Sequence, residues 1–501
     1  MGIISAHDAW KALVLSTATM NAPIETLPFE IISQIMLLAL PAPESRTLRM
    51  ILSLVKVCPR WRGIASETPE LWALPLPRMN DRVTKEVASS LTANLLRLSA
   101  PYPFPVSIQN VIPKGDILAP LSAVRDASQR WESLQIHSSY SGEGEAELLD
   151  HIPAGKFDSL KKIDLRLVDV NLHRSPNFRV FESAPQLCEV KIVMRDAFHI
   201  PPMPWTRLTR LSLTCASPQA CLDAVMHCES IVEARFVTRQ WMSEVVFSKV
   251  ATLRYLKTLE IEMAVGSQGE DLGPFLRGLR LPSLETLKLS MDYSNAGDGT
   301  FTWNLLPELE FFLSHSQKIE HLTLDQTVFS DDMPAILALT PCLTHLVFAD
   351  GETAKQDVLF KALDGHELVP KLQSLELKDL FFESTESVLW SMIKTRCYPR
   401  APEGQKEPVP QRLKRLNLEW SEKLVNPYDP RTIPEKQFSH EFRDALWTYE
   451  KQGLDFSGIR IHMPELEKKR RVISELQHNE QAIRRGTWRW AMPNYYYNYV
   501  E

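Results

Sequence analysis

The sequence predicts an α/β chain in which a small helical module is followed by an irregular solenoid of parallel strands, with helices on its convex side. Two patterns predict this fold class. Apolar residues recur at helical spacing between residues 27 and 72, and a short pattern of the form L-x-x-L-x-L recurs from about residue 131 onward. With 501 residues the chain is also too long for one compact core, so more than one structural unit is expected.

The composition is that of a folded protein without a general affinity for nucleic acid or lipid. Apolar residues make up 44 % and charged residues 24 % of the chain, which are ordinary values. A net charge of −6 gives no reason to expect a nucleic-acid partner. No run of 18 apolar residues and no signal peptide are found, so no membrane partner is expected. Seven sparse cysteines favour a reducing compartment, cytoplasmic, nuclear or both.

The first expected helix lies within residues 27–40. Thr26 is predicted to cap it, and Pro28 fits the first turn, where a backbone N–H has no helical partner in any case. Ile31, Ile35 and Leu38 then recur at i, i+4 and i+7. With the apolar residues beside them they form a stripe that is wider than one small core requires.

Two further short helices are expected before residue 73. One runs from about residue 45 to residue 57, and the other begins near Pro59 and ends before Thr68, after which Trp72 adds an apolar side chain. Three short helices form only a small core, so the module is expected to pack against a neighbour. Its leftover apolar surface would fit the groove of a partner. The alternative interpretation is an ordinary three-helix bundle that has no partner.

Two strings in this module together resemble the F-box. They are LPFEIISQIMLLAL at residues 27–40 and VCPRWRGIASETPELW at residues 57–72. The resemblance implies a module that docks onto the Skp adaptor, and through it onto cullin, in ubiquitin ligases. Pro59 departs from the usual pattern, which has a basic residue there, and the spacer between the strings holds two prolines. By this resemblance, the adaptor-facing positions are Leu27, Pro28, Glu30, Ile31, Ile35, Val57, Cys58, Trp61, Ile64 and Trp72.

Beyond the module, an amphipathic helix is expected over residues 83–98 and is followed by the recurring L-x-x-L-x-L pattern. The middle apolar residues of successive copies lie 21 to 41 positions apart, which is mostly the period of leucine-rich repeats with insertions. Nine clear copies are centred on Ile163, Val190, Leu211, Leu259, Leu287, Leu322, Leu346, Leu375 and Leu416, and two weaker copies on Leu134 and Ala234.

Each copy predicts a short strand, and helices are expected between strands at residues 218–230, 334–339, 355–363 and 387–396. The Asn or Cys that usually follows the last leucine is absent, so irregular coils are expected. Fungal F-box proteins with degenerate leucine-rich repeats look most similar. The outward residue of each L-x-L predicts the surface that binds a target protein: Asp164, Lys191, Ser212, Glu260, Lys288, Thr323, Val347, Glu376 and Asn417.

No motif for a catalytic, cofactor or metal site is found. Cys215, Cys221, His227 and Cys228 fit no standard zinc spacing, so these cysteines are expected to be buried core residues. The basic cluster at residues 468–471 is interpreted as a charged helix face, with a nuclear address as the alternative.

The predicted segments are a lead at residues 1–20, the F-box at 21–76, the solenoid at 77–465 and a basic and aromatic tail at 466–501. The leading hypothesis is a non-catalytic, target-recognition subunit of an SCF-type ubiquitin ligase, with an unknown target. The second hypothesis is a scaffold that acts outside any ligase, and the third is a free-standing repeat protein without an adaptor.

Overall fold

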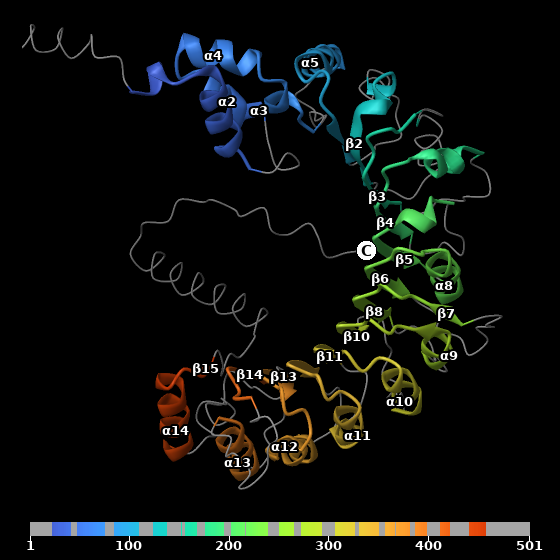
Figure 1. Cartoon of the computed structure of the whole chain (residues 1–501), viewed down its shortest axis with the longest axis vertical. Helices are drawn as coiled ribbons and strands as arrows, with labels where there is room; N and C mark the ends of the chain where they lie inside the picture. Colours follow the sequence, from blue (N-terminus) through green and yellow to red (C-terminus); the bar gives the residue numbers. More distant parts are fainter. Residues whose placement is uncertain are drawn as a thin grey trace, which may run out of the picture. The chain divides into compact units, whose positions relative to one another are not determined.

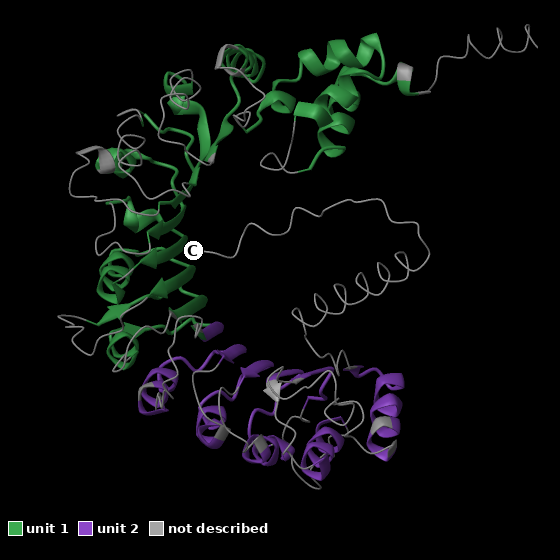
Figure 2. Cartoon of the chain, turned by 180° about the vertical axis from the view of Figure 1, so that it is seen from behind, with its two compact units in different colours: residues 1–284, 291–301 green, residues 285–290, 302–501 purple. Residues whose placement is uncertain are grey.

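The computed structural model describes residues 23–41, 48–75, 85–109, 124–137, 152, 156–167, 176–194, 202–215, 217–238, 250–264, 272–292, 306–325, 330–349, 356–365, 367–380, 386–397, 411–420 and 440–456. The chain divides into two compact units, residues 1–284 with 291–301 and residues 285–290 with 302–501 (Figure 2). The predicted lead at residues 1–20, the tail at 466–501 and its basic cluster lie outside the described residues.

The first unit begins with three short α-helices flanked by two 3-10 turns, as the sequence predicted for the helices (Figure 1). The elements are η1 (Pro23–Thr26), α2 (Phe29–Leu38), α3 (Leu48–Val55), α4 (Pro59–Ser66) and η3 (Pro69–Trp72). The predicted cap at Thr26 is wrong, because Thr26 ends η1 and Pro28 occupies the cap position without a side-chain hydrogen bond. The second helix begins at Leu48, later than predicted, and residues 42–47 lie outside the described residues.

The core of this helical module is small and extends beyond it. Ile32, Met36 and Ile51 are fully buried in one cluster, and Leu95 belongs to the same cluster. Leu95 lies on α5 (Lys85–Leu98), the predicted amphipathic helix, and the half-buried Leu91 and Leu98 of α5 pack there too. The module therefore packs against α5, which follows the boundary predicted at residue 76.

Arg130 connects α5 to the first strands of the sheet. Its guanidinium donates to the carbonyl oxygens of Leu96 and Tyr102 at 3.1 and 2.7 Å and to the hydroxyl of Ser99 at 2.8 Å. Burial lowers the pKa of Arg130. Because the ordinary pKa of arginine is very high, the side chain stays charged at neutral pH. One cation thus joins the end of α5 to the start of the strand β2 (Trp131–His137).

The rest of the first unit is a sheet of parallel strands with helices on one side (Figure 1). Each strand pairs in parallel with the next one named. In order they are β1 (Phe104–Gln109), β2 (Trp131–His137), β3 (Lys162–Arg166), β4 (Glu189–Met194), β5 (Arg210–Cys215), β6 (Glu233–Thr238) and β8 (Thr258–Ala264). The connections include η4 (Ser128–Arg130), η6 (Pro176–Ser183), η7 (Trp205–Arg207), α8 (Pro218–Met226), α9 (Gly273–Arg277) and the two-residue pair β7 (Ala251–Thr252) with β9 (Leu279–Arg280).

The second unit repeats this architecture, with an α-helix between each strand and the next (Figure 2). Its strands, again parallel from one to the next, are β10 (Thr286–Asp292), β11 (His321–Asp325), β12 (His345–Ala349), β13 (Ser374–Leu380), β14 (Arg415–Trp420) and β15 (Asp455–Phe456). Its helices are α10 (Leu306–Ser314), η8 (Ser330–Asp332), α11 (Met333–Ala338), α12 (Gln356–Asp364), α13 (Glu386–Cys397) and α14 (His440–Lys451).

The leucines of the repeated pattern form the core of both units. In β11, for example, Leu322 and Leu324 are buried while His321 and Thr323 point to the other face, as alternation along a strand requires. The predicted fold class is confirmed, because all eleven predicted strands form and all four predicted helices are present. The structure adds β1, β7, β9 and β15, which do not follow the L-x-x-L-x-L spacing, and the helices α9, α10 and α14.

Candidate binding surfaces

The ten predicted adaptor-facing residues divide into three groups by exposure. Pro28, Glu30, Ile31 and Val57 are exposed, and Leu27, Ile35, Cys58 and Trp61 are half-buried. Ile64 and Trp72 are buried in the core of the module. In this structure these last two side chains therefore support the module from inside and are not part of its open surface.

One face of α2 carries apolar side chains that the module leaves uncovered. Ile31 is 46 % exposed and Leu38 83 % exposed, and the half-buried Ile35 lies between them on the same side of the helix. The neighbouring face, about 100° around the helix, holds the buried Ile32 and Met36. The stripe that looked too wide for a small core is thus wide because it covers both a core face and an open face. The exposed large apolar residues of the module are Ile24, Phe29, Ile31, Leu38, Met50, Leu52 and Val57.

Local contacts explain the second string of the F-box resemblance. Cys58 caps α4, since its sulfur accepts a hydrogen bond from the backbone N–H of Trp61 at 3.5 Å, and Pro59 occupies the first helical turn. The Trp72 indole donates to the carbonyl oxygen of Ala65 at 2.7 Å and so ties η3 to α4. Arg60 donates to the carbonyl oxygen of Leu27, which connects α4 to the segment before α2. These residues therefore fix how the helices of the module pack.

The strand register places the predicted target-facing residues side by side within each unit. In the first unit Asp164 pairs with Lys191 and Lys191 with Ser212, and Arg235 then connects Ser212 to Glu260. In the second unit the row is Lys288, Thr323, Val347, Glu376 and Asn417. All of the predicted residues are half-buried on the face opposite the leucine core. The prediction that these residues bind a target stays a prediction, but each set shares one face.

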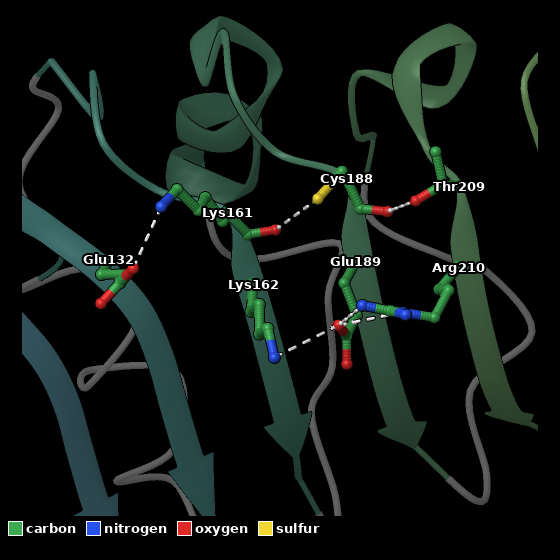
Figure 3. A network of polar contacts seen from close by, with 7 residues as sticks. All are labelled: Glu132, Lys161, Lys162, Cys188, Glu189, Thr209 and Arg210. Atoms are coloured by element: carbon green, nitrogen blue, oxygen red, sulfur yellow. Dashed lines mark hydrogen bonds and ion pairs between the residues drawn. The ribbon is translucent and has the colours of Figure 1, made fainter. Parts of the chain in front are cut away.

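A charged network crosses the first of these faces (Figure 3). The Glu189 carboxylate on β4 accepts hydrogen bonds from Arg210 on β5, the nearer at 2.9 Å, and lies 3.6 Å from the ammonium group of Lys162 on β3. Lys161 and Glu132 form a further ion pair at 3.1 Å. Glu189 holds the pKa of Arg210 above its usual value. Because these pairs are exposed, each contributes at most about 1 kcal/mol, so they order the surface more than they stabilise the fold.

Two more groups of opposite charges lie on the same face of the first unit. Asp164 contacts Arg166 at 3.2 Å and the Nε2 atom of His137 at 3.3 Å. Burial lowers the pKa of His137, and Asp164 opposes this shift only in part. Arg235 contacts Glu262 at 2.9 Å and Glu260 at 3.6 Å. Among the described residues, acids and bases are therefore paired along this face.

The face of the second unit is less densely charged. His321 and His345, register partners on β11 and β12, stack with ring centroids 4.2 Å apart and planes 19° from parallel. Burial, then the nearby His321 and Arg415, lower the pKa of His345. Further along, Lys378 pairs with Glu376 at 3.3 Å and Arg415 with Asp455 at 3.0 Å. Neutral residues such as Thr323 and Val347 lie between these groups.

Sequence reasoning missed most of these charged residues because it considered only the outward residue between the two leucines of each L-x-L. Residues two positions before and after it point to the same face, and these include Lys162, Glu189, Arg210, Arg166 and Glu262. The period of two along a strand would have found them.

The predicted buried cysteines are buried. Cys215 and Cys221 lie with their sulfurs 3.4 Å apart, and the Cys228 thiol donates to the carbonyl oxygen of Ala224. Burial raises the pKa of Cys228 to about 12, so this thiol stays protonated. Within the described parts of the chain, no three or more His, Cys, Asp or Glu residues gather as metal ligands. No described helix combines the length and apolar character needed to cross a bilayer.

Comparisons with known proteins do not show a family for this chain. No protein-family model matches the chain, and no curated protein matches it either. Among solved structures, the crystal structure of a TLR13–ssRNA13 complex is similar over 64 % of this chain and 39 % of that one, at 15 % sequence identity and a TM-score of 0.38. The match thus spans less than half of that protein's length, and at this level of similarity it supports no inference about partners.

Proposed function

We propose that this protein is a non-catalytic target-recognition subunit of an SCF-type ubiquitin ligase. In this proposal the helical module binds the Skp adaptor, and through it cullin, while the repeat faces hold a target protein. The chain would then raise the effective concentration of the target beside the conjugating enzyme. It would need no nucleophile or general base of its own.

The exposed apolar face of α2 is the observation that carries the proposal. Ile31 and Leu38 leave large apolar side chains in water on a module whose own core is small, and such surface typically marks a protein contact. The two strings that resemble the F-box lie on the same module. For the repeats, the support is the unbroken row of outward residues on each face.

The test uses exposed residues, whose substitution leaves the core intact. Ile31→Asp and Val57→Asp in the full chain are expected to weaken binding to purified Skp adaptor about tenfold or more, because a charge would be buried at the contact. Tyr255→Asp, an equally exposed residue of the repeats, is the matched control and is expected to bind as the wild type does. Binding that survives both module variants would contradict the proposed docking face.

The other two hypotheses differ from the proposal in what is captured with the chain. A pull-down probed for Skp adaptor and cullin separates them. Adaptor together with cullin supports the ligase subunit, and adaptor without cullin supports a scaffold outside the ligase. Capture of neither would leave a free-standing repeat protein.

A further inference from the structure

Two buried cysteines of the first unit lie in contact where β5 meets α8 (Figure 1). Cys215 ends β5, and Cys221 lies in the first half of α8. Their sulfur atoms are 3.4 Å apart. Since a disulfide bond is about 2.05 Å long, the two sulfurs need to approach by only about 1.4 Å to be joined. Small side-chain rotations are therefore enough to bring them to bonding distance.

The short connection between the strand and the helix fixes this contact. Alternation along β5 turns Cys215 into the core. Two positions later Ser217 caps α8, since its hydroxyl accepts a hydrogen bond from the backbone N–H of Ala220 at 3.3 Å. The helix thus begins directly after the strand, and its first turns bring the fully buried Cys221 beside Cys215.

The hydrogen bonds of the pair make the two sulfurs unequal. The Cys215 thiol donates to the carbonyl oxygen of Ser217 at 3.3 Å, so the hydrogen between the two sulfurs comes from Cys221. This hydrogen bond lowers the pKa of Cys215 from its ordinary value, whereas burial raises the pKa of Cys221 well above its own. Because the thiolate is the form that attacks oxidants, Cys215 is the sulfur that reacts first, and Cys221 is a resolving thiol beside it.

We propose that Cys215 and Cys221 form a reversible oxidation site, at which hydrogen peroxide converts the two thiols into a disulfide. In the first step the Cys215 thiolate attacks one peroxide oxygen, so an S–O bond forms, the O–O bond breaks, and the leaving hydroxide takes up a proton to become water. In the second step the Cys221 sulfur attacks the sulfenic sulfur of Cys215. The S–S bond then forms, the S–O bond breaks, and the hydroxide leaves with the proton of Cys221 as a second water. The two thiols lose two electrons, which reduce the peroxide to two water molecules.

Burial determines which oxidant and which cysteine take part. Cys215 is 2 % exposed and Cys221 0 % exposed, so the oxidant is a small molecule that enters when the start of α8 opens locally. Cys228 at the other end of α8 is equally buried, but its thiol donates to the carbonyl oxygen of Ala224 and its pKa is about 12. Cys228 is therefore expected to stay reduced when the pair is oxidised.

The test is to treat the full-length protein with hydrogen peroxide, to alkylate the remaining thiols after unfolding, and to analyse the tryptic peptides by mass spectrometry. No Lys or Arg lies between residues 211 and 234, so one peptide, residues 211–235, contains Cys215, Cys221 and Cys228. In the wild type this peptide is expected to be alkylated only once and to have lost two hydrogen atoms. Dithiothreitol before alkylation is expected to restore three alkylated thiols.

Substitutions assign the bond to the two sulfurs. Cys228→Ala is the matched control, and its peptide is expected to form the disulfide and to escape alkylation completely. In Cys221→Ala the sulfenic acid on Cys215 has lost its resolving partner, so dimedone is expected to label Cys215. In Cys215→Ala, dimedone is expected to leave Cys221 unlabelled. Circular dichroism before oxidation checks the fold of each variant, and the wild-type peptide tests the site without any substitution.

Two results would overturn the proposal. Three alkylated thiols in the oxidised wild-type peptide would show that the pair does not form a disulfide, and a disulfide that disappears in Cys228→Ala would assign the bond to another pair. Dimedone labelling of Cys221 in Cys215→Ala would overturn the order in which the two sulfurs react. None of these results bears on adaptor binding by the helical module.

Discussion

At the scale of single residues, Arg396 is a fully buried cation in the second unit. It lies on α13 with no exposed surface, and its guanidinium donates to the carbonyl oxygens of Leu363, Leu368 and Val369 at 2.6, 2.8 and 3.0 Å. Burial lowers its pKa to about 10, which still leaves it charged at neutral pH. Val369 has a φ of 45°, a conformation that a β-branched residue rarely adopts. Arg396 thus holds a strained turn between α12 and β13.

Removing this side chain is therefore expected to be costly. Arg396→Met leaves the carbonyl groups of Leu363, Leu368 and Val369 without this donor, and a buried group left unpaired costs about 1–3 kcal/mol. We expect the free energy of unfolding of the second unit to fall by about 3 kcal/mol or more. Urea denaturation measures this change. Lys394→Met, an exposed cation on the same helix, is the control, and an equal loss in that variant would contradict the role given to Arg396.

A second residue, His137, is expected to make the stability of the first unit depend on pH. The pKa of His137 is below its ordinary value, chiefly through burial, so below about pH 6.5 the folded protein binds fewer protons here than the unfolded chain does. Stability therefore decreases as the pH falls below about 6.5. Thermal unfolding between about pH 7.5 and about pH 5.5 is expected to show a smaller decrease in His137→Gln than in the wild type. An identical pH dependence in the two proteins would count against this origin.

At the scale of elements, α5 has a role that its sequence alone did not reveal. Its amphipathic spacing predicted a helix, but not that Leu95 would join the core of the helical module. A fragment of residues 23–101 is expected to unfold at a higher temperature than a fragment of residues 23–75, because the shorter one exposes the core that α5 covers. Leu95→Ala is expected to lower the free energy of unfolding of the longer fragment by about 2–5 kcal/mol. Equal melting temperatures for the two fragments would show that α5 is dispensable.

The strands show which structural features the repeated sequence pattern predicts and which it does not. Each L-x-L placed two leucines in the core and one residue on the outer face, so the strands and rows such as Asp164–Lys191–Ser212 followed from spacing alone. β1 was missed because its buried residues, Val106 and Ile108, lack the preceding leucine of the pattern. The ion pairs of Glu189 and the stack of His321 on His345 depend on which repeats are neighbours and in what register. A single sequence without a structure does not give that information.

At the scale of the whole molecule, the predicted order of a helical module followed by repeats is present, but two of the proposed docking residues are not on its surface. Ile64 and Trp72 both lie in the second string of the sequence resemblance, and both are buried. A sequence motif does not distinguish residues that form the core from residues that contact a partner, because both roles restrict the type of residue. Leu38 is the opposite example. It lies in the first string and is exposed, but it was not predicted to face the adaptor.

The repeat architecture predicts that a destabilising substitution affects only the repeats next to it. In a solenoid each repeat contacts only its neighbours, so stability is approximately a sum of repeat and interface contributions. Leu375→Ala removes a fully buried side chain of β13, at a cost of about 2–5 kcal/mol. Hydrogen exchange is expected to become faster in β12, β13 and β14 and to stay unchanged in β2 to β5, while Glu376→Ala, its outward neighbour, changes neither. The adaptor binding that we propose for the helical module is expected to be unaffected by Leu375→Ala. Faster exchange across both units would instead show that the chain unfolds as a single cooperative body.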